Sequence, residues 1–189
     1  MTKDQTLQQI RKVVREPYSL VADWKEEKKL KVAGYYPMDF PEELYYASGF
    51  VPLAIFGSGG SITRADEYLQ GFSDSLARGL LHQCLSGDLD FLDVLVITHL
   101  DDTTRVLSSI CKRNLPVSYY QDFLPPKRWD TVLARRFLIE ELKRLKRDLE
   151  AFCQFEITEE ALDASFKIHN KDRSLLREIN RLRLMYPSL

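Results

Sequence analysis

An unbroken apolar segment near the middle of the chain constrains the fold more than any other feature of this sequence. Residues 93–98 read DVLVIT, with four aliphatic side chains in succession. A strand with one face in water would alternate apolar and polar residues, so an unbroken run indicates a strand covered on both faces, as in a parallel sheet. We therefore expect this segment inside a sheet that has helices on both sides.

Strand-like and helix-like segments alternate through the middle of the chain. Strands are predicted at residues 32–36, 51–56, 93–98 and 116–120, with helices at residues 42–47, 65–85 and 102–111. Such alternation favours an α/β fold with right-handed crossovers. We expect a doubly wound, flavodoxin-like parallel sheet of about four strands.

Helices are predicted at both ends of this α/β region. Apolar residues at helical spacing indicate helix over residues 1–30, interrupted at Pro17. Two long amphipathic helices are predicted to open at Asp130 and Thr158. The predicted organisation is an N-terminal helical segment (1–30), an α/β domain (31–125) and a C-terminal helical segment (126–189) in a single structural unit.

The composition narrows the class of protein. The chain carries 27 Lys and Arg against 28 Asp and Glu, a net charge of −1, so it lacks the basic excess of a general nucleic-acid binder. No apolar run approaches the roughly 20 residues of a membrane helix, and the polar N-terminus lacks a signal-peptide core. Three scattered cysteines do not suggest a disulfide framework. We expect a cytoplasmic protein with neither nucleic acid nor membrane as a partner.

The first candidate site is a glycine-rich loop after the second predicted strand. Gly57, Ser58, Gly59 and Gly60 could bring free backbone N–H groups close to an anion at the start of a helix. The spacing matches neither the dinucleotide fingerprint nor the P-loop, so a plain turn is the alternative.

Further candidates are acidic residues near predicted helix starts. The adjacent Asp101 and Asp102 could bind a metal or exchange protons. The alternative is helix capping, in which Asp102 takes the N-cap position and Asp101 is left without a structural task. Asp74 precedes Arg78 by four residues, a spacing that is usually a surface pair.

A set of aromatic residues near predicted loops and helix ends could form an interface patch or belong to the core. These residues are Tyr45, Tyr46, Tyr119, Tyr120, Phe123 and Trp129.

Several of these motifs together carry a family resemblance. They are Gly34–Pro37 followed by residues 40–52, the Gly57–Gly60 loop, residues 89–97 and residues 157–162 with His169, Asn170 and Arg173. With them the chain resembles the 2-hydroxyacyl-CoA dehydratase family, especially the smaller cluster-bearing subunit of ATP-dependent benzoyl-CoA reductases. The likeness covers nearly all of this chain but only about the first half of a typical member.

The resemblance implies a four-iron four-sulfur cluster, and this sequence departs from the family at its ligands. The two family cysteines correspond to Asp74 and Asp101, which are 27 residues apart. Iron–sulfur clusters require soft thiolate ligands, whereas carboxylate oxygen is hard. We therefore expect no cofactor in this chain, although the two carboxylates could hold a hard cation or be simply solvated.

The resemblance leaves two hypotheses for function. In the first, the chain is an enzyme subunit, a dehydratase (lyase) or an aromatic acyl-CoA reductase of anaerobic metabolism. A homologous subunit in a homo- or heterodimer and an ATP-dependent activator are then its expected partners. In the second, it is a non-enzymatic domain that binds acyl-CoA or a partner and has lost the redox chemistry. Both place the acyl-CoA at the loop of Gly57, Ser58, Gly59 and Gly60, with Arg64 as a further donor.

Overall fold

A four-stranded parallel sheet forms the centre of the computed structural model, which describes residues 3–57 and 62–185. Its strands are β1 (Lys31–Tyr36), β2 (Phe50–Ala54), β3 (Val94–Thr98) and β4 (Tyr119–Phe123). They lie in the order β2-β1-β3-β4, and every neighbouring pair is parallel. All five residues of β3 are buried, as the unbroken apolar run predicted.

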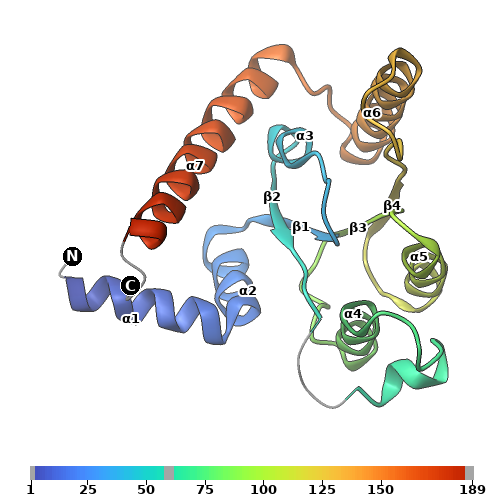
Figure 1. Ribbon diagram of the computed structural model, residues 1–189, viewed down its shortest axis with the longest axis horizontal. Helices are drawn as coiled ribbons and strands as arrows, with labels where there is room; N and C mark the ends of the chain where they lie inside the picture. The colour runs from blue at the N-terminus through green and yellow to red at the C-terminus, as the bar shows by residue number, and fades with distance from the viewer. Residues whose placement is uncertain (1–2, 58–61, 186–189) are drawn as a thin grey trace.

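Helices cover both faces of the sheet, which confirms the doubly wound fold (Figure 1). One face packs against α4 (Ser75–Ser86), α5 (Asp102–Asn114) and part of α2 (Pro17–Lys28). The other packs against α3 (Glu42–Ala47), α6 (Val132–Cys153) and the start of α7 (Glu159–Met185). Alternate residues of one strand serve the two cores, so Ile97 faces α5 while Val96 faces α6.

Two predicted elements are placed differently in the structure. The single helix expected over residues 65–85 is a 3-10 helix, η1 (Arg64–Glu67), followed by α4, which begins only at Ser75. Asp74 caps α4, and capping side chains favour a helix start at that point. The fourth strand begins at Tyr119 rather than Pro116, because the ladder with β3 pairs Tyr119 with Val94 and proline has no N–H for a ladder.

The N-terminal helices α1 (Lys3–Arg15) and α2 meet near Pro17, as predicted. Helix α2 is held to the sheet by Lys25, whose ammonium donates to Phe91 O at 2.6 Å and to Asp93 Oδ1 at 2.9 Å. The second oxygen of Asp93 accepts from Val32 N at 2.8 Å. One carboxylate therefore joins α2 to the amino-terminal ends of β1 and β3.

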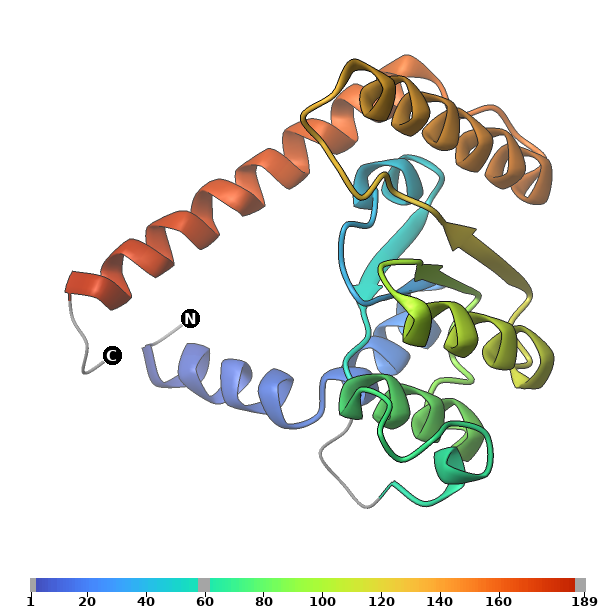
Figure 2. The same ribbon diagram turned by 45° about the vertical axis from the view of Figure 1, so that its right-hand side comes forward.

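Helix α7 is attached to the rest of the fold through its first half. Ser165 donates to Glu43 O at 2.9 Å, and Arg173 pairs with the carboxylate of Glu43. Every residue from 170 to 185 is exposed. Figures 1 and 2 show that α1 and α7 both extend away from the sheet and that their free ends approach each other. Of the helices in the described ranges, none has the length and apolar character needed to cross a membrane.

Candidate functional site

The carboxyl edge of the sheet is where a doubly wound fold normally binds its ligands. The helix that follows β1 packs on one face of the sheet, and the helix that follows the neighbouring β3 packs on the other. The loops after these two strands therefore diverge and leave space between them.

Asp74 lies at this edge and begins α4. Its Oδ1 accepts from Leu76 N at 3.2 Å, which is an N-cap interaction. Its Oδ2 accepts from the hydroxyl of Tyr36, the last residue of β1, at 3.3 Å. The predicted surface pair with Arg78 is not formed, because Arg78 pairs with Asp66 of η1 instead.

Asp101 caps α5, and the prediction that Asp102 would do so was wrong. Asp101 Oδ1 accepts from Thr104 N at 2.7 Å, and Thr104 Oγ1 accepts from Asp101 N at 3.0 Å, so the two residues form a capping box. Asp102 is the first helical residue, and 99% of its side chain is exposed. The N-cap position needs an extended backbone, which Asp101 adopts.

Tyr36 shows that the two aspartates share one region. Its side chain is buried, and burial together with the negative charges of Asp74 and Asp101 raises the pKa of its hydroxyl. Both carboxylates are therefore close enough to act on the same phenol. Both helix starts therefore lie near the carboxyl end of β1, as expected for the carboxyl edge.

The glycine-rich loop is described only in part. Ser58, Gly59 and Gly60 lie outside the described residues. Gly57 follows β2 and passes close to α4, where a Cβ atom would lie 2.4 Å from Leu76 O and 3.0 Å from the Cα of Gly79. This close approach explains a glycine at position 57 without reference to a ligand.

Arg64 is not brought together with the two aspartates. It lies in η1, and its guanidinium donates to Leu85 O at the C-terminal end of α4. Since α4 starts at Asp74 and rises about 1.5 Å per residue, Leu85 lies about 16 Å along the helix from that cap. The guanidinium of Arg64 is therefore placed toward the opposite end of α4.

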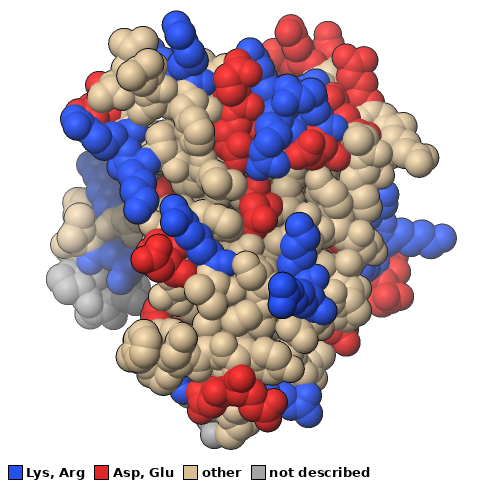
Figure 3. Space-filling view, turned by 90° about the vertical axis from the view of Figure 1, so that its right-hand side faces the viewer, with Lys and Arg blue, Asp and Glu red and all other residues tan. Residues whose placement is uncertain are grey.

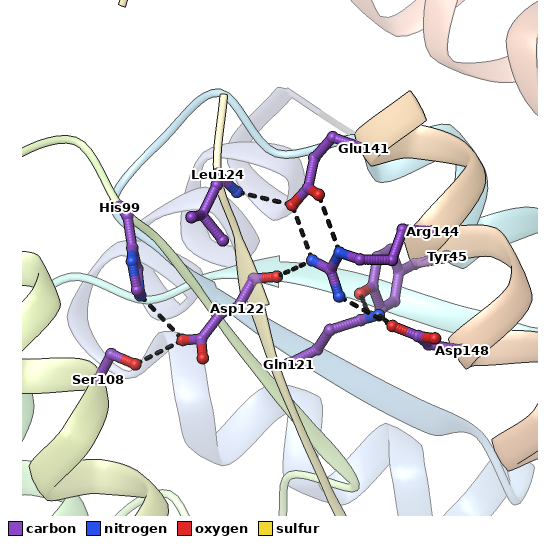
Figure 4. Close-up of polar contacts among 9 residues, drawn as sticks. All are labelled: Tyr45, His99, Ser108, Gln121, Asp122, Leu124, Glu141, Arg144 and Asp148. Carbon is purple, nitrogen blue, oxygen red and sulfur yellow. Dashed lines mark hydrogen bonds and ion pairs between the residues drawn. The ribbon is translucent and has the colours of Figure 1, made fainter. Parts of the chain in front are cut away.

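A second group of polar residues at the same edge was not singled out by the sequence. His99, the residue after β3, contacts Asp122 Oδ1 of β4 through its Nε2 at 2.9 Å, and Ser108 of α5 donates to the same oxygen (Figure 4). His99 also lines a cavity of about 350 Å³ between the loops that follow β1, β3 and β4. The available signal was that His99 and Asp122 fall near the carboxyl ends of two predicted strands.

Arg144 of α6 fixes the end of β4 from the other face. Its guanidinium donates to Asp122 O at 2.7 Å, to both carboxylate oxygens of Glu141 and to Asp148 Oδ2 at 2.8 Å (Figure 4). Glu141 also accepts from Leu124 N at 3.0 Å. Burial alone would raise the pKa of Glu141, but the hydrogen bonds from Arg144 and Leu124 hold it below its ordinary value.

The surface over α5, β4 and α6 carries charges of both signs. Figure 3 shows Lys and Arg side chains interspersed with Asp and Glu on this face. Pairs such as Arg144 with Glu141 and Lys143 with Glu140 account for part of this pattern. The face therefore lacks a broad region of a single sign.

Comparison with known proteins identifies the family. The family described as 2-hydroxyglutaryl-CoA dehydratase, D-component, matches residues 37–189. The chain belongs to the 2-hydroxyacyl-CoA dehydratase family. This result confirms the resemblance that the sequence motifs carried.

Relatives of known function in the 2-hydroxyacyl-CoA dehydratase family are subunits of larger enzymes. The chain is 31% identical over 188 residues to the beta subunit of (R)-2-hydroxyglutaryl-CoA dehydratase from Acidaminococcus fermentans, covering 97% of this chain and 48% of that protein. It is 30% identical over 173 residues to a subunit of benzoyl-CoA reductase from Thauera aromatica, covering 90% and 45% respectively. It is 29% identical over 184 residues to the beta subunit of lactoyl-CoA dehydratase from Anaerotignum propionicum, covering 97% and 48%. The chain thus spans about half the length of the curated relatives it matches.

The side chains at the two positions that the sequence resemblance matches to cluster cysteines do not suit an iron–sulfur cluster. Asp74, Asp101 and Tyr36 offer oxygen atoms, and such clusters are held by thiolates. Cys84 and Cys111 lie about three turns further along α4 and α5, where they are buried in the core. Within residues 3–57 and 62–185, no group of three or more His, Cys, Asp or Glu side chains is arranged to hold a metal ion.

Proposed function

We propose that this chain is a non-redox subunit of a 2-hydroxyacyl-CoA dehydratase or benzoyl-CoA reductase type of enzyme, and that it binds an acyl-CoA thioester without an iron–sulfur cluster of its own. One observation carries the proposal: in a chain of this family, Asp74 and Asp101 cap the two helices whose starts the sequence resemblance matches to the cluster cysteines. Both carboxylates already accept backbone N–H groups, so they serve the fold without a metal.

A partner subunit would supply the redox chemistry. The relatives are named as subunits, which supports an assembly with a homologous chain. That chain would carry an intact cluster, reduced by an ATP-dependent activator. The exposed apolar side chains of α1 and of the distal half of α7 offer surface for such a partner. They include Leu7, Ile10, Val13, Val14, Leu175, Leu176, Ile179 and Leu182. The place of action would be the cytoplasm.

The acyl-CoA would be contacted by the loop of Gly57, Ser58, Gly59 and Gly60. This loop follows β2, and backbone N–H groups after a parallel strand are suited to phosphate oxygens. Arg64, in the next element, would add a positive charge for the diphosphate. Its contact with Leu85 O lies toward the end of α4 opposite Asp74, so this charge would lie apart from the two aspartates.

The second candidate function is a non-enzymatic domain that binds acyl-CoA or a protein partner. It is favoured by the mismatch between the oxygen side chains at the cluster position and the thiolates that the family's cofactor requires. It differs from the first candidate in one respect only: no partner would restore turnover.

Metal analysis tests the absence of a cluster. The protein is purified under anaerobic conditions and reconstituted with iron and sulfide. We expect its iron and sulfide contents to be no higher than those of an Asp74→Ala/Asp101→Ala double variant treated in the same way. A stoichiometric cluster with its brown absorbance in the parent chain, absent from the variant, would overturn the non-redox assignment.

Calorimetry tests the binding of acyl-CoA. We expect saturable heat on titration with benzoyl-CoA or a 2-hydroxyacyl-CoA, and loss of that heat in Gly59→Trp. Gly71→Trp is the matched control, because a Cβ atom at Gly71 would have no neighbour within 4 Å. Equal binding by both variants would exclude the loop, and no heat from the parent chain would exclude the shared claim of both candidate functions.

A further inference from the structure

The cavity beside His99 is built by three loops at the carboxyl edge of the sheet. Asp39 comes from the loop after β1, His99 from the loop after β3, and Lys127 and Trp129 from the loop after β4. Asp39 has a positive φ of 56°, a conformation that Asp tolerates better than most residues. At about 350 Å³, the cavity has the size of a small ligand site.

Asp122 fixes the protonation pattern of the His99 ring. A carboxylate can only accept, so the 2.9 Å contact requires the hydrogen on His99 Nε2 and leaves Nδ1 of the neutral ring as an acceptor. Asp122 is itself held on both sides of the sheet, by Ser108 Oγ at its carboxylate and by Arg144 at its backbone carbonyl. His99 is thus oriented in the manner of a proton acceptor whose position is set by a carboxylate.

Acidic and basic side chains both lie around the ring of His99. Asp122 contacts it from β4, Glu141 of α6 is near enough for His99 to influence its pKa, and Asp39 shares the cavity wall. Lys127 lies on the same wall and carries the opposite charge. A positive ring would be stabilised by the acids, while a negative ligand atom would be stabilised by Lys127.

We propose that this cavity binds a small weak acid with an apolar body, such as a phenol or an aryl thiol, and that His99 takes the acid's proton. The O–H or S–H bond of the ligand breaks, and its proton moves to Nδ1 of His99. The ring becomes an imidazolium paired with Asp122, and the ligand becomes an anion paired with Lys127. Trp129, Pro125 and Pro126 provide the apolar wall for the ring of the ligand. This assignment does not depend on the acyl-CoA loop or on the cluster position.

The probe is 4-nitrophenol, and its methyl ether 4-nitroanisole is the control without an acidic proton. In buffer just below neutral pH, where free 4-nitrophenol is mostly un-ionised, we expect binding to raise the visible absorbance of the phenolate. The ring signals of His99 in NMR spectra should shift toward those of an imidazolium in the same titration. 4-Nitroanisole is expected to bind about tenfold more weakly and to leave the charge state of His99 unchanged.

Three variants separate proton transfer from simple burial. His99→Gln and Lys127→Gln are each expected to weaken the binding of 4-nitrophenol about tenfold or more and to remove the phenolate signal. Asp122→Asn presents a donor to Nε2, which would place the hydrogen on Nδ1, so it should remove the signal while 4-nitroanisole binds as before. His82→Gln on α4 and Lys143→Gln on α6 are the matched controls and should change nothing.

Lys127 is exposed, so its variant tests the proposal even if the substitutions at His99 and Asp122 impair folding. Equal affinity for the phenol and its methyl ether would overturn the proposal. An unchanged phenolate signal in Lys127→Gln would also overturn it, as would the lack of any His99 shift at saturating 4-nitrophenol.

Discussion

Asp101 and Thr104 hold each other's backbone N–H groups at the start of α5, at 2.7 Å and 3.0 Å. Because this reciprocal pair satisfies two donors that the helix leaves free, Asp101→Ala should lower the free energy of unfolding by about 1 kcal/mol. Asp101→Asn should retain most of the stabilisation that the Asp101 side chain provides. Asp102→Ala is the control, since that side chain is exposed, and chemical denaturation compares the three. Equal losses at both positions would argue against the capping role of Asp101.

Glu141→Gln should destabilise the protein at neutral pH by about 1–3 kcal/mol, because Arg144 and Leu124 N–H lose a charged acceptor. The folded pKa of Glu141 lies below its ordinary 4.5, so its stabilisation is present above that pH and is lost as the pH falls through the folded value. The difference between parent and variant should therefore shrink in acid.

Urea unfolding from pH 7 down to pH 3 measures this effect of Glu141. The exposed Glu140 pairs with Lys143 on the same helix, and Glu140→Gln should leave the stability nearly unchanged. A gap between parent and Glu141→Gln that stays constant across the acid range would contradict the assignment.

Gly57→Ala should destabilise the fold by about 1–3 kcal/mol, because the added Cβ atom would lie 2.4 Å from Leu76 O in the first turn of α4. Gly71→Ala provides the comparison: its Cβ would meet nothing within 4 Å, so it should be neutral or slightly stabilising. Thermal unfolding followed by circular dichroism gives both values. An unchanged stability in Gly57→Ala would mean that the close approach of Gly57 to α4 is absent in solution.

Tyr119 should ionise late in an alkaline titration. Burial and the nearby charge of Asp148 raise its pKa to about 12, and its ring stacks on Phe152 with the centroids 4.4 Å apart. The folded state holds this proton more tightly than the unfolded state, so stability should begin to fall as the pH rises above about 10.

Ultraviolet absorbance distinguishes early from late tyrosines, and Tyr119→Phe should remove amplitude from the late group. If all nine tyrosines of a protein that is still folded ionised together near pH 10, the raised pKa of Tyr119 would be refuted.

The pattern of apolar residues predicted the sheet, because a strand that is buried on both faces, such as β3, requires an unbroken apolar run. It did not predict where α4 begins, because the start depends on which polar side chain bonds to the free N–H groups, and Asp74 does so. For the same reason, the sequence pattern did not show that Asp101, rather than Asp102, caps α5.

The contact between His99 and Asp122 joins residues that are 23 positions apart, one just after β3 and the other in β4. Only the register of these two neighbouring strands brings them together. Among the aromatic residues considered for an interface, Tyr45 and Phe123 belong to the core, whereas Tyr46 and Trp129 are exposed. Sequence spacing alone does not distinguish the buried aromatic residues from the exposed ones, because both groups lie near strand and helix ends.

The exposed distal part of α7, residues 170–185, has a consequence for backbone dynamics. Sixteen successive exposed residues, from 170 to 185, give the amides there little protection beyond the helix's own hydrogen bonds. In deuterated water these amides should exchange through local fraying, well ahead of those in β3, which open only with the whole domain. A protein that docks on this arm would be visible as slowed exchange over these residues, even where the rest of the chain is unchanged.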